Sequence, residues 1–231
     1  MKHHYNRYLT AMHCALLIGL APLSLSYAST KNASIEMTGN YTQSSKNLVI
    51  KKANTTLYEA NAHWTKERFT LEVDTGHNAQ LGSIVITSSL VQALDEQGKL
   101  LWDNERLNEK VCLPELFGEF IRAHLTELIQ GKNLTCVGPI IKAKKLAPFK
   151  VYLAKQQNNT LEVKIGPGSI GMWFFMDEVT MLLNADASQV LAYDGVSAAP
   201  ETLTGDMAYL TISSPLGTPL DIATIESSVL W

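Results

Sequence analysis

Apolar and polar residues alternate with a period of two over much of the chain. Between residues 47 and 90 the apolar positions that repeat in this way include Phe69, Leu71, Val73, Ile84 and Ile86. Such alternation is typical of strands in a sheet with one buried face. The turn residues at 95–98 then separate two further strands, because Gly98 accepts the positive φ that a tight hairpin often requires.

Strand-like segments return in the second half of the chain. They span 134–141, 149–154, 161–165, 179–184, 190–193 and 207–212. The short polar stretches 158–159 and 185–188 lie between them and have the composition of hairpin turns. Hairpins join antiparallel neighbours, so the pattern predicts a meander.

The segment near 114–130 has a helical period instead. Pro114 suits the first turn of a helix and Gly131 suits its end. Between them, the apolar side that recurs at intervals of three and four contains Leu116, Phe117, Phe120, Ile121, His124, Leu125 and Leu128. The other face is expected to carry mainly Glu115, Glu119, Arg122 and Glu127. The pattern predicts one amphipathic helix whose apolar stripe lies against the sheet.

The first 28 residues are expected to be a signal peptide. Lys2 and Arg7 precede a short apolar run at 15–21, and Ser26 and Ala28 are small residues at the positions that a signal peptidase reads. The run is shorter than the roughly 20 apolar residues that cross a bilayer, so cleavage near Ala28 is expected and no integral membrane segment should remain.

Composition narrows the possible partners. Residues 29–231 form a chain of 203 residues, which is enough for a single domain with its own core. This chain keeps 17 basic residues against 22 acidic ones, a formal charge of −5. A surplus of negative charge disfavours nucleic acid and anionic membrane surfaces as partners.

The cysteines and histidines point to a disulfide and not to a metal site. Cys112 and Cys136 remain after signal cleavage, and an exported chain with two cysteines most often pairs them. The helix between them would rise by about 25 Å, and the residues after Gly131 could return by about 20 Å, so a bond is feasible if the chain doubles straight back. The remaining histidines have no metal-ligand spacing, and His124 is expected to be packed and hydrogen-bonded. No cofactor is predicted.

No catalytic motif is convincing. Asp74-Thr75-Gly76 resembles the carboxylate turn of aspartic proteases, but there is no second copy and a strand that ends in Asp-x-Gly is an ordinary turn. Residues 184–188 begin like a calcium loop, yet Gln189 and Gly195 stand where the loop requires glycine and glutamate. We predict no catalytic residue, and whether the protein is an enzyme stays open, with a hydrolase the least favoured class.

The candidate ligand-binding residues lie in a run that is apolar on both faces. Trp173, Phe174, Phe175 and Met176 belong to the segment 170–176. A strand buried on both sides of its sheet explains such a run, and so does a surface that lines a ligand cavity or contacts a membrane. If the sheet curves around a cavity, these rings supply large apolar contacts.

A resemblance covers about residues 113–200. The motifs at 117–124, 127–132, 177–184 and 191–197 resemble those of a group of uncharacterised exported bacterial proteins, in which a helix that ends in Gly-Lys precedes a strand meander. The group implies no catalytic residue. By fold analogy, the expected curved sheet with its helix is similar to that of the periplasmic lipoprotein carriers, whose sheet forms a half-barrel.

These observations predict a single α+β domain, a curved and mostly antiparallel sheet that wraps like a half-barrel around one amphipathic helix. The expected location is a Gram-negative periplasm. The expected function is non-catalytic binding of a lipid or another apolar or amphipathic envelope ligand. Two alternatives remain, an envelope scaffolding or interaction protein with a filled core and, less favoured, a hydrolase with a polar cleft. An empty apolar cavity would favour the carrier, and a shifted carboxylate or histidine in a cleft would favour the enzyme.

Overall fold

The computed structural model describes residues 35–42, 44–77, 80–105, 109–140, 144–169, 177–200, 207–212 and 229–231. All of them belong to one compact unit, Ala33–Trp231. The expected signal peptide at 1–28 and the apolar run 170–176 lie outside the described residues.

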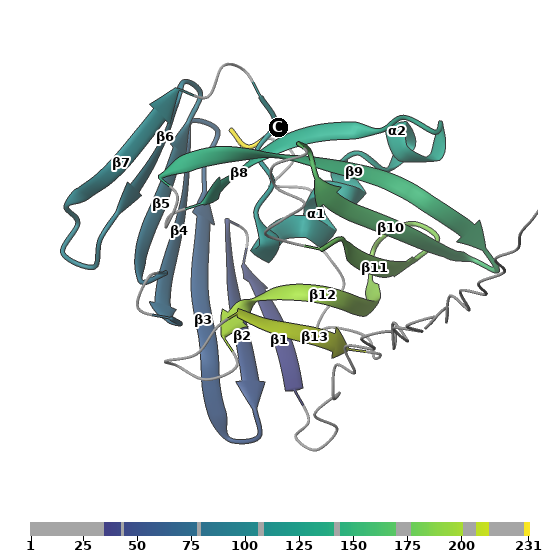
Figure 1. The fold of residues 1–231 in the computed structure, drawn as a ribbon, viewed down its shortest axis with the longest axis horizontal. Helices are drawn as coiled ribbons and strands as arrows, with labels where there is room; N and C mark the ends of the chain where they lie inside the picture. The colour runs from purple at the N-terminus through teal and green to yellow at the C-terminus, as the bar shows by residue number, and fades with distance from the viewer. Residues whose placement is uncertain are drawn as a thin grey trace, which may run out of the picture. The chain divides into compact units, whose positions relative to one another are not determined.

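Seven strands form the first sheet (Figure 1). They are β1 (Ile35–Thr42), β2 (Ser45–Lys52), β3 (Thr55–Trp64), β4 (Arg68–Thr75), β5 (Gly82–Thr87), β6 (Leu90–Leu94) and β7 (Leu100–Glu105). Each strand pairs antiparallel with the next one in the sequence, so the sheet is a simple meander. The strands predicted from the period-two pattern are therefore confirmed, but β5 buries the consecutive residues Ile84, Val85 and Ile86 and thus has no exposed face at its centre.

Six strands form the second sheet. They are β8 (Leu134–Ile140), β9 (Lys145–Gln157), β10 (Thr160–Pro167), β11 (Val179–Asn184), β12 (Val190–Pro200) and β13 (Met207–Ile212). They too pair antiparallel in sequence order. Asn158 and Asn159, with φ of 45° and 67°, make the two-residue turn between β9 and β10, which confirms the hairpin predicted there.

The strands form two sheets, whereas the sequence predicted one continuous curved sheet. The reason is the connection between β7 and β8, which contains helical turns. A hairpin would have continued the ladder, but a helical connection cannot pair with β7, so a new sheet begins at β8. The part of the prediction that is confirmed is a mostly antiparallel sheet structure with few helices.

The predicted helix is present but is divided into three short pieces. These are the 3₁₀ turn η1 (Pro114–Leu116), α1 (Phe117–Ala123) and α2 (Leu125–Ile129). His124 separates the two α-helices with φ of −111° and ψ of 18°. Its ring packs edge-on against Phe120 of α1, and its Nδ1 lies 3.1 Å from Oε1 of Glu127 in α2. These contacts hold the interruption in place.

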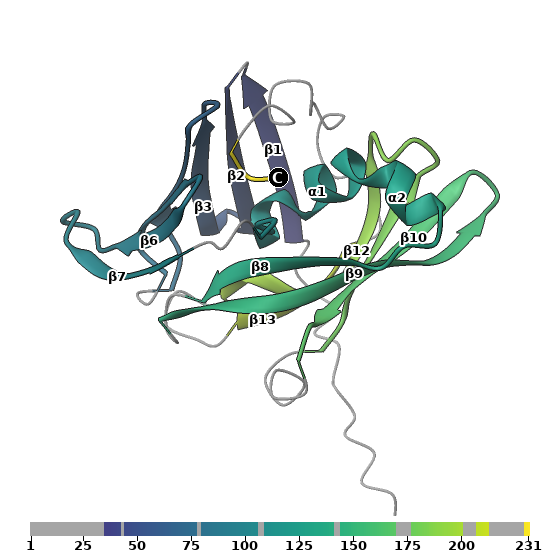
Figure 2. The same ribbon diagram turned by 90° about the horizontal axis from the view of Figure 1, so that it is seen from above.

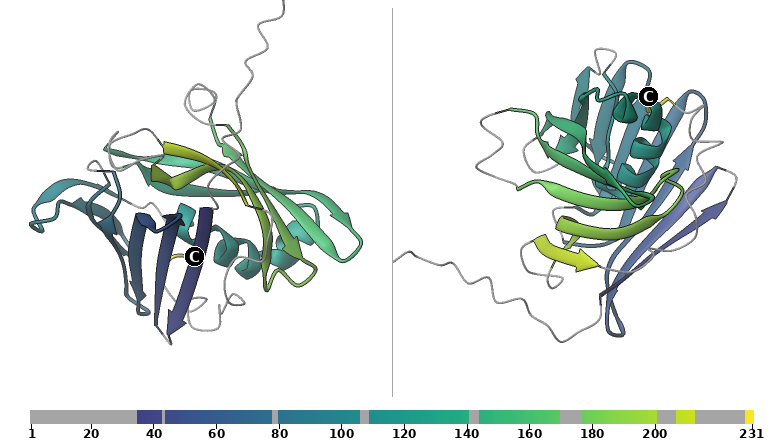
Figure 3. Two further views of the ribbon diagram at one scale, coloured as in Figure 1. Left: turned by 90° about the horizontal axis from the view of Figure 1, so that it is seen from below. Right: turned by 90° about the vertical axis from the view of Figure 1, so that its right-hand side faces the viewer.

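The helical pieces pack into a core shared with both sheets, and Figures 2 and 3 show α1 beside the strands of each sheet. The fully buried side chains of the predicted stripe include Leu116, Phe120, Ile121 and Leu128. Leu125 is only half-buried and packs at the edge of the core. The apolar stripe is thus confirmed for most of its length.

The disulfide prediction is confirmed. Cys112 and Cys136 are bonded with a Cα–Cα distance of 5.7 Å. Cys136 lies in β8, and Cys112 lies just before η1, so the bond ties the start of the helical segment to the second sheet. A parallel bridge between Val111 and Val137 lies next to it.

The last residues described also contact the helical segment. The amide of Val111 donates to the carbonyl of Leu230 at 2.9 Å, and Leu230 is fully buried. The ring of Trp231 meets Phe120 edge-on with centroids 5.7 Å apart. The C-terminal residues therefore pack against the helical segment at Phe120.

Candidate functional site

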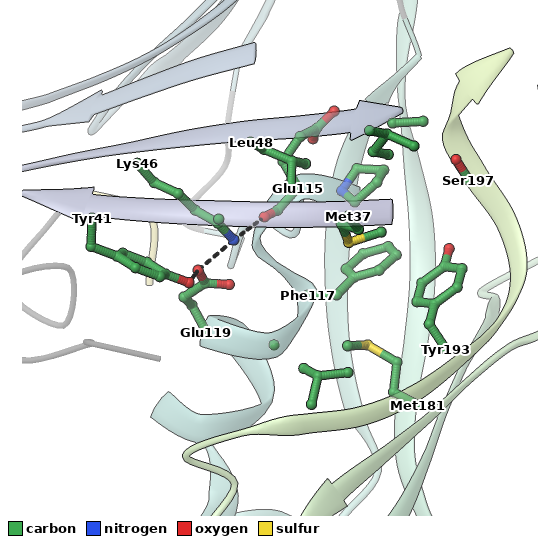
Figure 4. A pocket seen from close by; sticks show the side chains of 16 residues that line it. Met37, Tyr41, Lys46, Leu48, Glu115, Phe117, Glu119, Met181, Tyr193 and Ser197 are labelled. Atoms are coloured by element: carbon green, nitrogen blue, oxygen red, sulfur yellow. Dashed lines mark hydrogen bonds and ion pairs between the residues drawn. The ribbon is translucent and has the colours of Figure 1, made fainter. Parts of the chain in front are cut away.

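A pocket of about 60 Å³ lies where α1 meets both sheets. Its wall comes from β1 and β2 on one side, from η1 and α1 at its base, and from β11 and β12 on the other side. Figure 4 shows the lining side chains, which are those of Met37, Gly39, Tyr41, Lys46, Leu48, Ile50, Pro114, Glu115, Phe117, Gly118, Glu119, Met181, Val190, Tyr193, Ser197 and Ala198.

The register of β1 against β2 builds one wall of this pocket. Met37 lies opposite Ile50, Gly39 opposite Leu48, and Tyr41 opposite Lys46. Residues two apart in a strand point to the same face, so all three pairs face the helix. The last pair is polar, whereas the first two are apolar, and the wall therefore changes from apolar to polar along the strands.

Glycine at position 39 gives Lys46 its room. A Cβ atom at Gly39 would lie 3.3 Å from Cε of Lys46, which is a tight contact. The aliphatic part of Lys46 can thus lie close to the backbone of β1 while its ammonium group reaches α1. A lysine that is 7% exposed needs partners for its charge.

Glu119 and the backbone of Glu115 supply those partners. Lys46 Nζ lies 2.6 Å from Glu119 Oε1 and donates to the carbonyl oxygen of Glu115 at 2.6 Å. Tyr41 donates from its hydroxyl group to the same Glu119 Oε1 at 2.5 Å. Lys46 Nζ also lies 5.4 Å from the centre of the Tyr41 ring, within the range of a cation–π contact.

The Glu115 side chain turns to a different partner. Tyr58 of β3 donates from its hydroxyl group to Glu115 Oε1 at 2.5 Å, and Glu115 Oε2 is buried without a hydrogen-bond partner among the described residues. Burial raises the pKa of the Glu115 carboxyl, against the lowering effects of the Tyr58 hydrogen bond and of the Lys46 charge. Burial and the nearby Glu115 also raise the pKa of Tyr58 well above its usual value.

The burial of Glu115 and Glu119 corrects the sequence analysis. These two residues were expected on the face of the helix away from the sheet, but they are 8% and 1% exposed. They are four positions apart and therefore share one side of the helical segment, which packs against β1–β3. The helical segment is buried on an acidic side as well as on its apolar stripe, because it has a sheet on each side.

One sequence signal for this polar site was available. Lys46 stands in the same alternating phase as Leu48 and Ile50, and all three are buried. A lysine in the buried phase of a strand requires a buried acceptor. The sequence does not indicate that Glu119, 73 positions away, is the acceptor for Lys46.

The candidate ligand-binding residues Trp173, Phe174, Phe175 and Met176 lie outside the described residues, so their role stays a prediction. The described pocket reaches β11 through Met181. It was not among the sites predicted from the sequence.

His124 is packed and hydrogen-bonded, as predicted. Its Nδ1 lies 3.2 Å from Lys110 Nζ and 3.1 Å from Glu127 Oε1. Burial and the charge of Lys110 lower the pKa of His124, in opposition to Glu127. In the part of the chain that the structure describes, no group of three or more acidic, histidine or cysteine side chains has the arrangement of a metal site.

The two motifs that were set aside have structural roles. Asp74 accepts a hydrogen bond from Asn61 at 2.6 Å on an exposed part of the first sheet. Asn184 and Ser188 are joined by a hydrogen bond of 2.8 Å in the turn between β11 and β12. Both motifs therefore stabilise turns or neighbouring strands.

A second polar cluster lies on the second sheet. Tyr152 donates from its hydroxyl group to Glu178 Oε1 at 2.7 Å, and Lys164 lies 3.4 Å from Glu178 Oε2. Burial and Glu178 raise the pKa of Tyr152 to about 12. Lys164 and Glu178 are 32% and 25% exposed, so water can solvate them.

No helix among the described residues is long and apolar enough to cross a membrane. Comparison of the chain with protein-family models, with curated proteins and with solved structures finds no match.

Proposed function

We propose that the protein binds an apolar or amphipathic molecule of the cell envelope, without catalysis, in the pocket between α1 and the two sheets. The observation that carries this proposal is the composition of the pocket. Met37, Phe117 and Met181 converge on it from three different elements, and the ion pair between Lys46 and Glu119 lies at its polar end (Figure 4). An apolar wall with a few convergent polar groups is the usual form of a small-molecule site.

The size of the pocket limits what enters it. A volume of about 60 Å³ is that of a few water molecules, whereas sites for whole drug-sized ligands occupy roughly 300–1,000 Å³. The pocket therefore accepts the end of an amphipathic molecule, such as its polar group and the first few carbon atoms. The two methionines can adapt to the shape of that end, because their side chains are unbranched.

The location belongs to the same proposal. The disulfide between Cys112 and Cys136 is of the kind that persists in an oxidising compartment, which supports export to a periplasm after cleavage near Ala28. We further propose that the two sheets serve together as the half-barrel that the family resemblance implies, with α1 on its inner side. Contacts from α1 to both sheets support this arrangement.

A scaffolding function is the second candidate. Many apolar side chains of the described residues are fully buried, whereas Leu100 and Leu101 on β7 are 47% and 39% exposed. β7 is the last strand of the first sheet, so these apolar side chains stand at a sheet edge. Exposed apolar residues at an edge favour contact with another protein.

The binding of a neutral apolar probe tests the proposal. The neutral probe 12-(1-pyrenyl)dodecan-1-ol has a hydroxyl group and first methylene groups that can enter the pocket while its ring stays outside, and we expect the wild-type protein to bind it with saturation, followed by fluorescence anisotropy. Met37→Trp should weaken this binding at least tenfold, because the larger side chain fills the pocket. Thr38→Trp is the matched control, since Thr38 is exposed and neighbouring strand residues point to opposite faces.

Circular dichroism should show that both variants are folded. A wild-type protein that binds no probe would overturn the carrier proposal and favour the scaffold. Equal loss of binding in both variants would place the site elsewhere.

A further inference from the structure

We propose that this pocket selects a ligand whose polar group is cationic and donates hydrogen bonds, such as a primary alkylammonium ion, and rejects anionic amphiphiles. This inference rests on the proposed function and names the chemical class of the ligand. It follows from how the charges of Lys46, Glu115 and Glu119 are used within the described residues.

One oxygen of Glu119 is unused. Glu119 Oε1 accepts from Tyr41 and pairs with Lys46, whereas Oε2 has no hydrogen-bond partner among the described residues. The side chain is 1% exposed, so water can do little to solvate this oxygen. In Figure 4 the second oxygen points away from Tyr41, on the side of Met37 and Phe117. Unlike Glu115 Oε2, this oxygen is not among the buried side-chain atoms that lack a partner, so it keeps a small access on the side of the pocket that Glu119 lines. A ligand that donates to it would give the poorly hydrated carboxylate a hydrogen bond that the protein does not supply.

The ammonium group of Lys46, in contrast, is already used. It contacts Glu119 Oε1 and the carbonyl of Glu115, both at 2.6 Å, and faces the ring of Tyr41. Among the described lining residues, Lys46 is the only one with a basic side chain. An incoming carboxylate or phosphate would therefore compete with Glu119 for the Lys46 ammonium group, whose charge Glu119 already neutralises.

The balance of charge around the pocket supports the same choice. Two carboxyl groups, those of Glu115 and Glu119, line the pocket together with one ammonium group. With Lys46 and Glu119 ionised, the sum is zero when Glu115 is protonated and −1 when it is not. In neither state is there a net positive charge to attract an anion, and a like charge placed beside a carboxylate is repelled.

The rest of the wall suits the carbon atoms next to such a cation. An ammonium group at Glu119 Oε2 would form a charge-assisted hydrogen bond, which is stronger than a neutral one. The first methylene groups would then contact Met37, Phe117 and Met181, whose side chains line the same pocket. The remainder of the chain would extend out of the small volume.

Ligands that differ only in their polar group test this inference. Octylamine, 1-octanol and octanoate share one chain length, and at pH 7 they carry a positive charge, no charge and a negative charge. Each is titrated against wild-type protein loaded with 12-(1-pyrenyl)dodecan-1-ol, and displacement of the probe is followed by fluorescence anisotropy. We expect octylamine to bind at least tenfold more tightly than octanoate, with 1-octanol between them.

A variant series identifies the residue. Glu119→Gln should weaken the binding of octylamine at least tenfold and should change the affinity for 1-octanol by less than threefold. Glu127→Gln is the matched control, because Glu127 is 37% exposed, pairs with Lys110 and does not line the pocket. It should leave all three ligands unchanged.

The outcomes separate the two proposals. Octanoate binding as tightly as octylamine, or unchanged octylamine binding by a folded Glu119→Gln protein, would overturn the cation inference while probe binding still supports the pocket. A wild-type protein that binds neither the probe nor any of the three ligands would overturn the proposed function itself. If Glu119→Gln does not fold, the order of the three ligands on the wild type decides the inference alone.

Discussion

Lys46 and Glu119 form a buried ion pair between a strand of the first sheet and the helical segment that follows the sheet. The Nζ–Oε1 distance is 2.6 Å, and the two side chains are 8% and 1% exposed. The pair also forms the polar end of the pocket, next to Tyr41. One interaction thus joins α1 to β2 and places two opposite charges at this end of the pocket.

Removal of one partner of this pair should destabilise the protein strongly. Lys46→Met leaves the Glu119 carboxylate buried without its cation, and breaking a buried pair in this way costs about 3–5 kcal/mol. Urea denaturation followed by circular dichroism gives the free energy of unfolding. The double variant Lys46→Met/Glu119→Met should recover most of the loss, because two apolar groups need no charge partner.

The pair of Lys110 and Glu127 provides the control for this experiment. Its Nζ–Oε1 distance is 3.2 Å, and both side chains are more than one-third exposed. Lys110→Met should therefore change the free energy of unfolding by about 0–1 kcal/mol. An equal effect of Lys46→Met and Lys110→Met would show that the pair at Lys46 is solvated in solution.

Phe120 should be one of the most sensitive positions in the core. Its side chain is fully buried. The centroid of its ring lies 4.8 Å from that of His124 and 5.7 Å from that of Trp231. Truncation of a buried phenylalanine to alanine costs about 3–5 kcal/mol, so Phe120→Ala should lower the urea midpoint markedly. Ile129→Ala, at a position that is 46% exposed, should leave the midpoint nearly unchanged. A similar midpoint shift in both variants would mean that the apolar stripe does not form the core in solution.

The disulfide should contribute to stability through the loop that it closes. Cys112 and Cys136 are 24 residues apart, and a loop of that length corresponds to about 3.5 kcal/mol in the chain-entropy model. The Cys112→Ala/Cys136→Ala variant should therefore unfold at a lower urea concentration. Alkylation of the denatured, unreduced protein should modify neither cysteine, as read by peptide mass mapping, and modification of both would refute the bond.

Strands were the part of the fold that the sequence predicted best. Strands such as β4 and β6 bury one face, so alternate residues such as Leu71 and Val91 become apolar, and this local rule is visible without the structure. The division into two sheets was not predictable in the same way. A series of strand segments does not say where the ladder stops, because that depends on how the connection before β8 packs.

The helix and the site show a similar limit. The apolar stripe around Phe120 was predicted from its period, but the interruption at His124 depends on Lys110 and Glu127 as well as on the local sequence. The acidic residues of the helical segment were assigned to the wrong environment, since a helix between two sheets buries more than one face. Only the phase of Lys46 in β2 pointed to a buried polar group.

The buried carboxyl of Glu115 should make stability depend on pH in a characteristic direction. Burial raises its pKa in the folded protein above the usual value of 4.5, which the unfolded chain retains. Between the two pKa values the unfolded state has released its proton while the folded state keeps it. The stability associated with this group is therefore fully present below about pH 4.5 and is lost as the pH rises through the folded pKa.

Glu115→Gln isolates this effect, because glutamine keeps a similar shape and an acceptor for the Tyr58 hydroxyl group without titrating. Urea denaturation at intervals from pH 4 to pH 8 gives the free energy of unfolding of both proteins. The value for the variant should increase relative to the value for the wild type as the pH rises. Groups whose pKa is lowered on folding, such as Glu127 and His124, lose stability on acidification instead. They are present in both proteins, so their contribution cancels in the difference. A difference that stays constant over this range, or that grows toward low pH, would show that Glu115 is not held in a desolvated site.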